Sequence, residues 1–228
     1  MKKMLLKSIV VLLSVLIIQG CESSADNESN ISDTQTPTPE TPKVLVKGKI
    51  ATDFTIEGLA YKCIPTEKSI DVIHYTGKLG EFECELDNQA AFYIGDIYLG
   101  SFRPPNEEYT FITPHSFLRE YENNHKSIIK IVQLINSVST HKTYSELDNS
   151  GNTIYYDYNS ITRDSHELLK DTSINITQST YIQELESYLG VLVNTSEAIT
   201  AINKFLPGLI ATRYVMDENG NISTEFYQ

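Results

Sequence analysis

The 228-residue sequence contains no tryptophan, only three cysteines and few basic side chains. Lys and Arg together number 18, against 30 Asp and Glu, so the formal net charge is −12. A chain this acidic is poorly suited to binding nucleic acid through its phosphates, and we expect no nucleic-acid partner. Hydrophobic residues make up 40% and charged residues 21%, which is typical of a folded protein and excludes disorder over the whole chain.

Catalytic motifs are also missing. The sequence has no Gly-x-Ser-x-Gly nucleophile elbow, no Gly-rich phosphate loop and no dinucleotide fingerprint. A single Glu122-x-x-His125 match lacks the second copy that a di-metal helix bundle requires. No two of the five histidines lie four residues apart; they are His74, His115, His125, His141 and His166. We therefore expect no catalytic residue, no metal site, no cofactor and no enzymatic activity.

Two five-residue segments have the Asp and Asn spacing that opens a calcium loop. They are 148–152, Asp-Asn-Ser-Gly-Asn, and 217–221, Asp-Glu-Asn-Gly-Asn. Both lack the bidentate Glu at the twelfth position, where Asn159 and Gln228 stand. Asp, Asn and Gly are also the residues that tight turns favour. Turns are therefore the preferred interpretation, and calcium binding is the alternative.

The first 20 residues have the pattern of an export signal. Three lysines precede the apolar run from Ser8 to Ile18, which is shorter than a stable membrane span. The following Ile18-Gln19-Gly20-Cys21 resembles the bacterial lipobox, which implies cleavage before Cys21 and lipidation of that cysteine. In such lipoproteins the cysteine carries three acyl chains, two in a diacylglyceryl thioether and one on its amine. Three chains anchor a protein durably, whereas the membrane binding of a single chain is only marginal. An ordinary cleaved signal with an incidental cysteine is the alternative.

The residues around the cleavage site also predict a location. Glu22, and not Asp, follows Cys21, which by analogy with enterobacterial lipoproteins implies the outer membrane. Loss of residues 1–20 removes three lysines and no acid, so the mature chain has a net charge of −15. The lipid must therefore supply the membrane attachment, because the negative charge of the folded part of the chain, called the body below, opposes binding to an anionic membrane. The sequence leaves open whether the body faces the periplasm or the medium.

After the lipidation site, residues 21–43 have the composition of a tether. They are mostly Ser, Asn, Asp, Thr, Pro and Glu, with prolines at alternate positions in Thr36-Pro37-Thr38-Pro39. Such a segment cannot bury enough apolar surface to fold and acts as a semi-stiff spacer. A recognition motif is the alternative.

Residues 44–114 predict a small β-sandwich. Short apolar runs separated by Gly and polar turns have the spacing of its strands. Four strands are expected at 44–50, 54–63, 70–75 and 81–86, and a hairpin at 91–100 that turns at Gly95-Asp96.

Three motifs in this part resemble a known module. They are Gly58-Leu59-x-Tyr61-x-Cys63, Thr76-Gly77-x-x-Gly80-x-Phe82-x-Cys84 and Phe92-x-Ile94-Gly95-x-x-x-Leu99-Gly100. Together they look like the Ig-like, carboxypeptidase-regulatory-like β module of Gram-negative colonisation-factor-type surface lipoproteins. The resemblance covers roughly residues 44–206 and implies an Ig-like sandwich in an exported surface protein.

Residues 115–228 predict a helical part that ends in a β-hairpin. Apolar residues recur at helical spacing in 128–138, 182–192 and 198–205. The hairpin is expected from 209–216 and 221–227 around the second Asp-Asn segment. We expect this hairpin either to add strands to the sheet of the β-sandwich or to pair with the segment 154–158. The predicted fold class is therefore α+β: a small Ig-like β-sandwich, a helical part and a C-terminal β-hairpin.

Lipidation of Cys21 leaves Cys63 and Cys84 as a pair in an oxidising compartment. Both lie in predicted strands of the same module, and we expect a disulfide between them. Two buried free thiols are the alternative.

The densest aromatic run is Tyr155-Tyr156-Asp157-Tyr158. Alternation in a strand, with Tyr156 and Tyr158 on one face and Tyr155 on the other, is the preferred interpretation; a recognition surface is the alternative.

These features together favour an outer-membrane-anchored lipoprotein that acts as a non-catalytic binding or accessory module. Adhesion, colonisation, and association with a pilus or secretion apparatus all suit such a protein. Its partners are the membrane, through the lipid, and a protein or glycan whose identity the sequence does not give. The alternative is an envelope antagonist, an immunity or exclusion lipoprotein that blocks a toxin, a phage or a conjugation apparatus. A hydrolase is the least favoured function.

Overall fold

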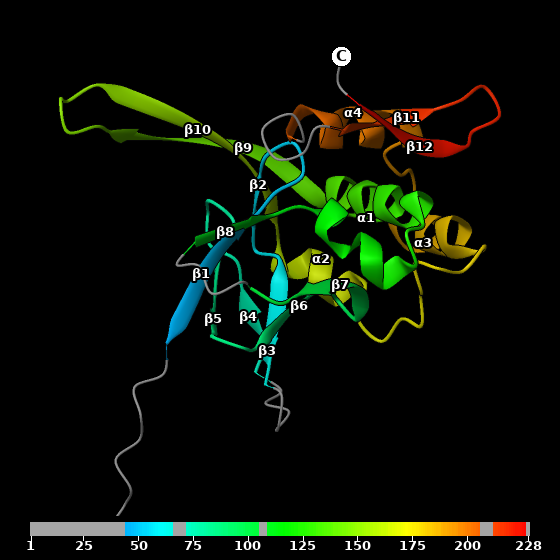
Figure 1. Cartoon of the computed structure of the whole chain (residues 1–228), viewed down its shortest axis with the longest axis horizontal. Coiled ribbons are helices and arrows are strands. Elements are labelled where there is room, and N and C mark those ends of the chain that lie inside the picture. The colour runs from blue at the N-terminus through cyan, green and yellow to red at the C-terminus, as the bar shows by residue number, and fades with distance from the viewer. Residues whose placement is uncertain (1–43, 66–71, 105–108, 206–211, 227–228) are drawn as a thin grey trace, which may run out of the picture. The chain divides into compact units, whose positions relative to one another are not determined.

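A computed structural model of the chain describes residues 44–65, 72–104, 109–205 and 212–226 (Figure 1). The predicted signal at 1–20 and the lipidated tether at 21–43 lie outside these residues. The described part combines several β-sheets with helices and ends in a β-hairpin, as the sequence predicts.

The segment from residue 44 to 112 forms short strands in two main sheets. A three-stranded sheet has the order β5-β1-β8 and a four-stranded sheet the order β4-β3-β6-β7. All pairs in them are antiparallel except β1 with β8, which is parallel. The strands of these two sheets are β1 (Leu45–Ile50), β3 (Ala60–Ile64), β4 (His74–Tyr75), β5 (Glu81–Glu85), β6 (Gln89–Ile94), β7 (Ile97–Phe102) and β8 (Tyr109–Ile112). The short strand β2 (Thr55–Glu57) belongs to a third sheet.

The strand predicted over 54–63 is wrong in one respect, because Gly58 divides it. Gly58 has φ +75°, a left-handed conformation that glycine adopts without strain. A Cβ atom there would clash with the carbonyl oxygen of Ile161. The chain therefore turns at Gly58, and β2 and β3 join different sheets: β2 pairs with the later strand β10 (Thr153–Ile161), and β3 pairs with β6.

The described residues of the second half of the chain form five helices. They are the 3-10 helix η1 (Pro114–Tyr121) and the α-helices α1 (His125–Val138), α2 (Arg163–Leu168), α3 (Tyr181–Leu189) and α4 (Thr195–Phe205). The side chain of Asn124 accepts the backbone N–H of Lys126 (3.1 Å) and so caps the start of α1. The apolar residues of α1 are nearly all buried, as its sequence pattern predicts.

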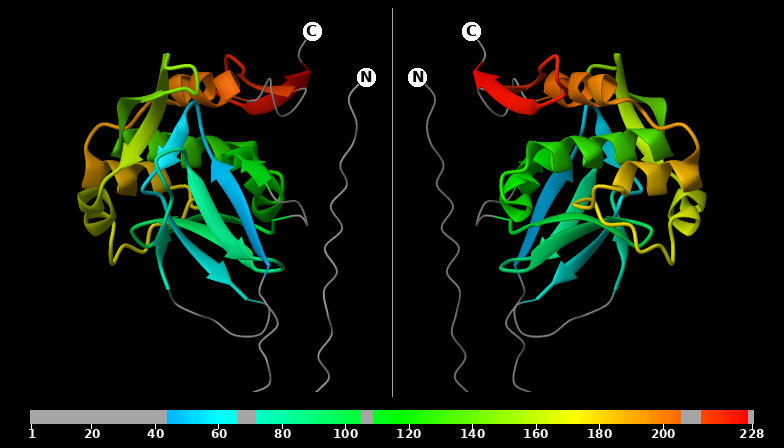
Figure 2. Two further views of the ribbon diagram at one scale, coloured as in Figure 1. Left: turned by 90° about the vertical axis from the view of Figure 1, so that its left-hand side faces the viewer. Right: turned by 90° about the vertical axis from the view of Figure 1, so that its right-hand side faces the viewer.

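Two β-hairpins complete the fold. β9 (Ser139–Leu147) and β10 (Thr153–Ile161) pair along nine residues, and β2 pairs with β10 only at Tyr158, Asn159 and Ser160. β11 (Thr212–Met216) pairs with β12 (Ile222–Phe226) and lies against α4 (Figure 2). Neither predicted pairing of this hairpin is found among the described strands, because β11 and β12 form a two-stranded sheet of their own that is joined neither to the main sheets nor to 154–158.

One hydrophobic core includes side chains from both predicted parts, 44–114 and 115–228. The aromatic ring of Phe92 on β6 lies 5.3 Å from Phe82 on β5 and 5.9 Å from Phe117 on η1, measured between ring centroids. Ile50, Ile128 and Leu185, from different elements, belong to the same buried cluster. The sheets and the helices are therefore held together by shared packing.

Candidate binding surface

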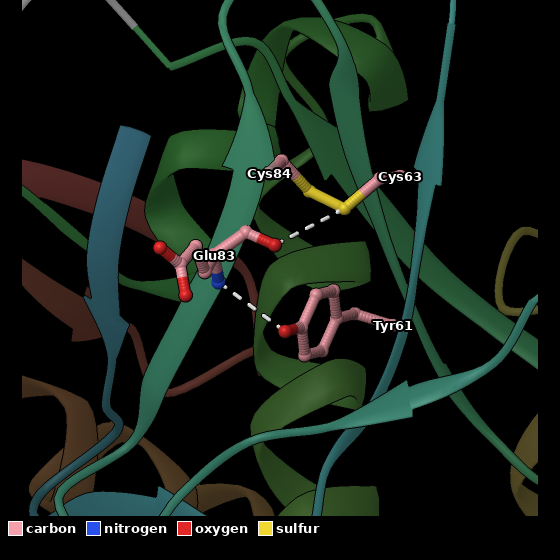
Figure 3. The surroundings of a disulfide bond; sticks show 4 residues. All are labelled: Tyr61, Cys63, Glu83 and Cys84. Atoms are coloured by element: carbon pink, nitrogen blue, oxygen red, sulfur yellow. Dashed lines mark hydrogen bonds between the residues drawn. A yellow bond between two sulfur atoms is a disulfide. The ribbon is translucent and has the colours of Figure 1, made fainter. Parts of the chain in front are cut away.

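The two cysteines predicted to pair form a disulfide between the two main sheets (Figure 3). Cys63 lies on β3 and Cys84 on β5, with their Cα atoms 5.5 Å apart, the usual separation for a disulfide. This finding confirms the predicted bond and excludes the two free thiols.

The surroundings of the disulfide indicate a structural role. The backbone N–H of Glu83 donates to the hydroxyl oxygen of Tyr61 (3.2 Å), which fixes β5 to β3 beside the bond. The Cys63 Sγ lies 3.3 Å from the carbonyl oxygen of Glu83; a disulfide sulfur has no proton, so this is a packing contact. Burial raises the pKa of Tyr61, which keeps its hydroxyl protonated.

His166 on α2 is held between two turns. Its Nδ1 accepts the backbone N–H of Gly95 (3.0 Å), and its Nε2 donates to the carbonyl oxygen of Gly58 (2.8 Å). These two bonds use both ring nitrogens of a neutral imidazole. Burial lowers the pKa of His166, which favours the same neutral form. His166 is therefore a cross-link between α2 and two turns of the β module.

Two more histidines gather around the buried Tyr214 of the C-terminal hairpin. His115 Nδ1 lies 2.6 Å from the Tyr214 hydroxyl, and the ring of His125 lies 5.5 Å from the tyrosine ring. Burial lowers the pKa of both histidines. Within the residues that the structure describes, no three His, Cys, Asp or Glu side chains are grouped so that they could hold a metal ion.

The two Asp-Asn segments considered for calcium form matching hairpin turns. In the first, Asp148 Oδ1 accepts the N–H groups of Ser150 (2.8 Å) and Asn152 (2.7 Å), and Oδ2 accepts from the Asn152 side chain (3.0 Å). Asp217 makes the same three bonds with Asn219 and Asn221. The side-chain bond from the following Asn is the largest cause of the lowered pKa of each Asp. The carboxylates therefore close the turns, as the preferred interpretation predicts.

A cleft of about 450 Å³ contains two further carboxylates, those of Asp96 and Glu120. Asp96 Oδ2 accepts the backbone N–H of Asp171 (2.7 Å), and Glu120 Oε2 accepts that of Ser101 (2.7 Å). Glu120 also accepts the hydroxyl proton of Tyr98. Both acids thus hold backbone groups in place.

The β9–β10 hairpin, residues 139–161, is the most distinctive surface of the described chain and is called the ribbon below. Figure 1 shows it extending away from the strands and helices that hold the core. On one face, the rings of Tyr144 and Tyr156 stack with centroids 5.1 Å apart, and Lys78 Nζ lies 4.9 Å from the Tyr144 ring. Tyr158, on that same face but nearer the body, is buried. The predicted alternation of the tyrosines is confirmed.

The opposite face of the ribbon exposes apolar side chains near its turn. Tyr155 is 71% exposed and Leu147 is 70% exposed, and the register makes them diagonal neighbours across the two strands. Nearer the body, Asp157 lies on the same face, 3.7 Å from His141 and 2.6 Å from the Thr143 hydroxyl.

β9 is the part of this surface that the sequence analysis missed. The signal that would have found it is the Asp-x-x-Gly-Asn turn at 148–152, which has the same spacing as the turn correctly predicted at 217–221. Read as a turn between two alternating segments, it predicts a hairpin whose first strand is Ser139–Leu147.

Cys21, the predicted lipidation site, lies outside the described residues. Within them, no helix combines the length and the hydropathy that a bilayer crossing requires. Comparison of the chain with protein-family models, with curated proteins and with solved structures found no match.

Proposed function

We propose that the chain is an outer-membrane-anchored lipoprotein that acts as a non-catalytic binding module and contacts its partner through the ribbon. The observation that carries the proposal is the exposure of Leu147 and Tyr155, diagonal neighbours on one face of a projecting hairpin, close to its turn. Exposed apolar side chains that cluster mark interaction sites, and tyrosine is enriched at protein interfaces.

The chemistry of the ribbon favours a protein partner. From Thr143 to Asp157 it carries three acidic side chains and no basic one; they are Glu146, Asp148 and Asp157. A partner with basic residues around an apolar patch is complementary to this surface. The position of the body is a separate part of the proposal. The lipobox-like sequence that ends at Cys21 and the tether at 21–43 support a body that is anchored to the membrane but held away from its surface.

We also propose that the two main sheets form an Ig-like sandwich. The disulfide between β3 and β5 and the contact of Phe82 with Phe92 support this arrangement, because each joins one sheet to the other. In such a sandwich the two sheets stack face to face, about 10 Å apart.

The ribbon is tested in cells that lack the gene. They are complemented with the wild-type chain or with the double variant Leu147→Ser/Tyr155→Ser, and adhesion is scored separately from sensitivity to toxin, phage and conjugation. The matched control is Tyr188→Ser/Val191→Ser, which removes two side chains that are 45% and 95% exposed elsewhere on the surface. We expect the ribbon variant to behave as the deletion and the control as the wild type, at equal protein levels.

The acidic ribbon also supports the second candidate, an envelope antagonist that masks a basic partner. Loss of adhesion in the ribbon variant favours the accessory module, and gain of sensitivity favours the antagonist. Wild-type behaviour of the ribbon variant in both assays, with a clear phenotype of the deletion, contradicts the role of the ribbon. Turnover of a substrate by the purified chain, lost on changing one acid or histidine, favours a hydrolase instead.

A further inference from the structure

The outer edge of β9 pairs with no other described strand. The sheet order is β2-β10-β9, so β9 is an edge strand of nine residues. Edge strands expose unpaired N–H and C=O groups that can template pairing with another chain. Pairing of a second strand onto such an edge is a common mode of protein recognition.

The turn fixes which backbone groups point to this edge. The N–H of Asp148 donates to the carbonyl oxygen of Asn152 (2.9 Å), so this pair is a hydrogen-bonded one. In an antiparallel ladder, bonded pairs recur at every second residue, and the residues between them direct their N–H and C=O groups outward. The outward-facing residues of β9 are His141, Thr143, Ser145 and Leu147.

The side chains of β9 select one register for pairing with a second copy. If the two strands run antiparallel and Tyr144 lies opposite Tyr144 of the other copy, Lys142 lies opposite Glu146 at two symmetric places. Both are non-hydrogen-bonded pairs, in which side chains lie closest. The outward groups of Thr143 then meet those of Ser145 of the other copy.

Neighbouring registers are less complementary. With Thr143 opposite itself, Lys142 faces Tyr144 and Glu146 faces Thr140, so no opposite charges meet. With Ser145 opposite itself, Lys142 faces Asp148, whose carboxylate already accepts three hydrogen bonds within the turn. Glu146 then faces Tyr144, and the overlap of the two strands shortens to 143–147. The register centred on Tyr144 also extends the stacked pair of Tyr144 and Tyr156 into a row of four tyrosine rings on one face.

We propose that the chain forms a symmetric dimer in which the β9 strands of two copies pair antiparallel around Tyr144. The contact joins two three-stranded sheets into one continuous sheet. It has the self-complementary geometry of a two-fold interface, since the same patch meets itself. The inference uses the edge of β9 and does not rest on the proposed function.

Cross-linking of the full chain in its native envelope tests the register. Residue 144 meets itself in a non-hydrogen-bonded pair, with Cα atoms about 4.5 Å apart, which lies within the range of a disulfide. We expect Tyr144→Cys to give a reductant-sensitive dimer on gels and the single variants Thr143→Cys and Ser145→Cys to give little. Co-expressed Lys142→Cys and Glu146→Cys chains are expected to cross-link to each other, which provides a second test if Tyr144→Cys does not accumulate.

Charge reversal tests the complementarity in the Tyr144→Cys background. Lys142→Glu alone and Glu146→Lys alone each place like charges opposite at both sites, and we expect about tenfold less cross-linked dimer. Co-expression of the two reversed chains restores opposite pairs in the mixed dimer and restores cross-linking. Stronger cross-linking at position 143 or 145 than at 144, no cross-linking at any position of accumulated protein, or no effect of charge reversal overturns the proposal.

Discussion

His166 ties three parts of the fold together through one imidazole. Its protonation would remove the lone pair with which Nδ1 accepts the N–H of Gly95. Burial lowers the pKa of His166 in the folded chain from its usual value near 6.5. Between the two pKa values the unfolded chain binds more protons, so the contribution of His166 to stability is complete above pH 6.5 and is lost as the pH falls.

We therefore expect the free energy of unfolding, measured by urea titration, to decrease from pH 7.5 to pH 5. His166→Gln keeps a donor and an acceptor but removes the titrating group, so its stability should depend less steeply on pH. A residual slope is expected, because burial also lowers the pKa of His115 and His125. If the free energy of unfolding depends equally steeply on pH in the wild type and in His166→Gln, the bonds to Gly58 and Gly95 do not restrain protonation of the His166 imidazole.

The Cys63–Cys84 disulfide contributes through the unfolded chain. The bond spans 21 residues, and in the chain-entropy model a loop of this size stabilises the folded state by about 3 kcal/mol. Cys63→Ala/Cys84→Ala is expected to lower the free energy of unfolding by about that amount in a urea titration. Reductant should shift the wild type in the same direction and leave the double variant unchanged; a double variant as stable as the oxidised wild type contradicts the estimate.

Among the elements, the two Asp-x-x-Gly-Asn turns close hairpins by the same set of bonds. Asp148→Ala removes the acceptor of the Ser150 and Asn152 amides, so we expect both amides to exchange hydrogen faster in NMR measurements. Asn149→Ala, which changes an exposed side chain in the same turn, is the matched control and should leave these rates unchanged. Unchanged exchange in Asp148→Ala would mean that the backbone bonds alone hold the turn.

The side chain of Asn203 on α4 holds the C-terminal hairpin through two hydrogen bonds. Asn203 donates to the carbonyl oxygen of Tyr214 (2.7 Å) and accepts the Tyr214 N–H (2.8 Å). Asn203→Ala leaves these half-buried backbone groups without partners, at a cost of about 1–3 kcal/mol. We expect faster limited proteolysis within 212–226 than in the wild type. Thr200→Ala, on the exposed side of the same helix, should be cut at the wild-type rate.

Elements with a strong periodic pattern could be predicted from the sequence, and those stabilised by distant contacts could not. The stripe Ile128, Ile131, Ile135 predicts α1 because all three side chains lie on its buried face. β9 is polar and largely exposed, so its residues give little apolar signal and depend on pairing with β10. The break at Gly58 follows from the approach of Ile161, about a hundred residues away, which no local pattern encodes.

In the candidate binding surface, too, some features were predictable from the sequence and others depend on distant contacts. The alternation of Tyr155, Tyr156 and Tyr158 predicts which face each ring occupies. Their different exposure depends on where β2 stops pairing with β10, beyond which the ribbon has two strands only. The disulfide was predictable from the number of cysteines and their compartment, whereas the contacts of His166 required the fold.

On the scale of the whole molecule, the net negative charge of the body opposes attachment of the chain to an anionic membrane. Residues 44–228 contain 14 basic and 25 acidic side chains, so the body is repelled by an anionic membrane surface. No helix within the described ranges is suited to crossing a bilayer. In the lipoprotein that we propose, retention at the membrane depends on the lipid on Cys21, and an attachment through acyl chains does not weaken when salt screens charges.

We expect the wild-type chain to sediment with membranes after washing with about 1 M salt, where the screening length is only about 3 Å. Cys21→Ser alone is an unsuitable test, because an uncleaved signal keeps its apolar run from Ser8 to Ile18 as a substitute anchor. The informative variant combines Cys21→Ser with an ordinary cleavable signal in place of residues 1–20, and it should appear in the soluble fraction. Incorporation of labelled palmitate into the wild type, and its loss in this variant, identifies the anchor. Sedimentation of the variant with membranes would instead require a second attachment through the body, against its net negative charge.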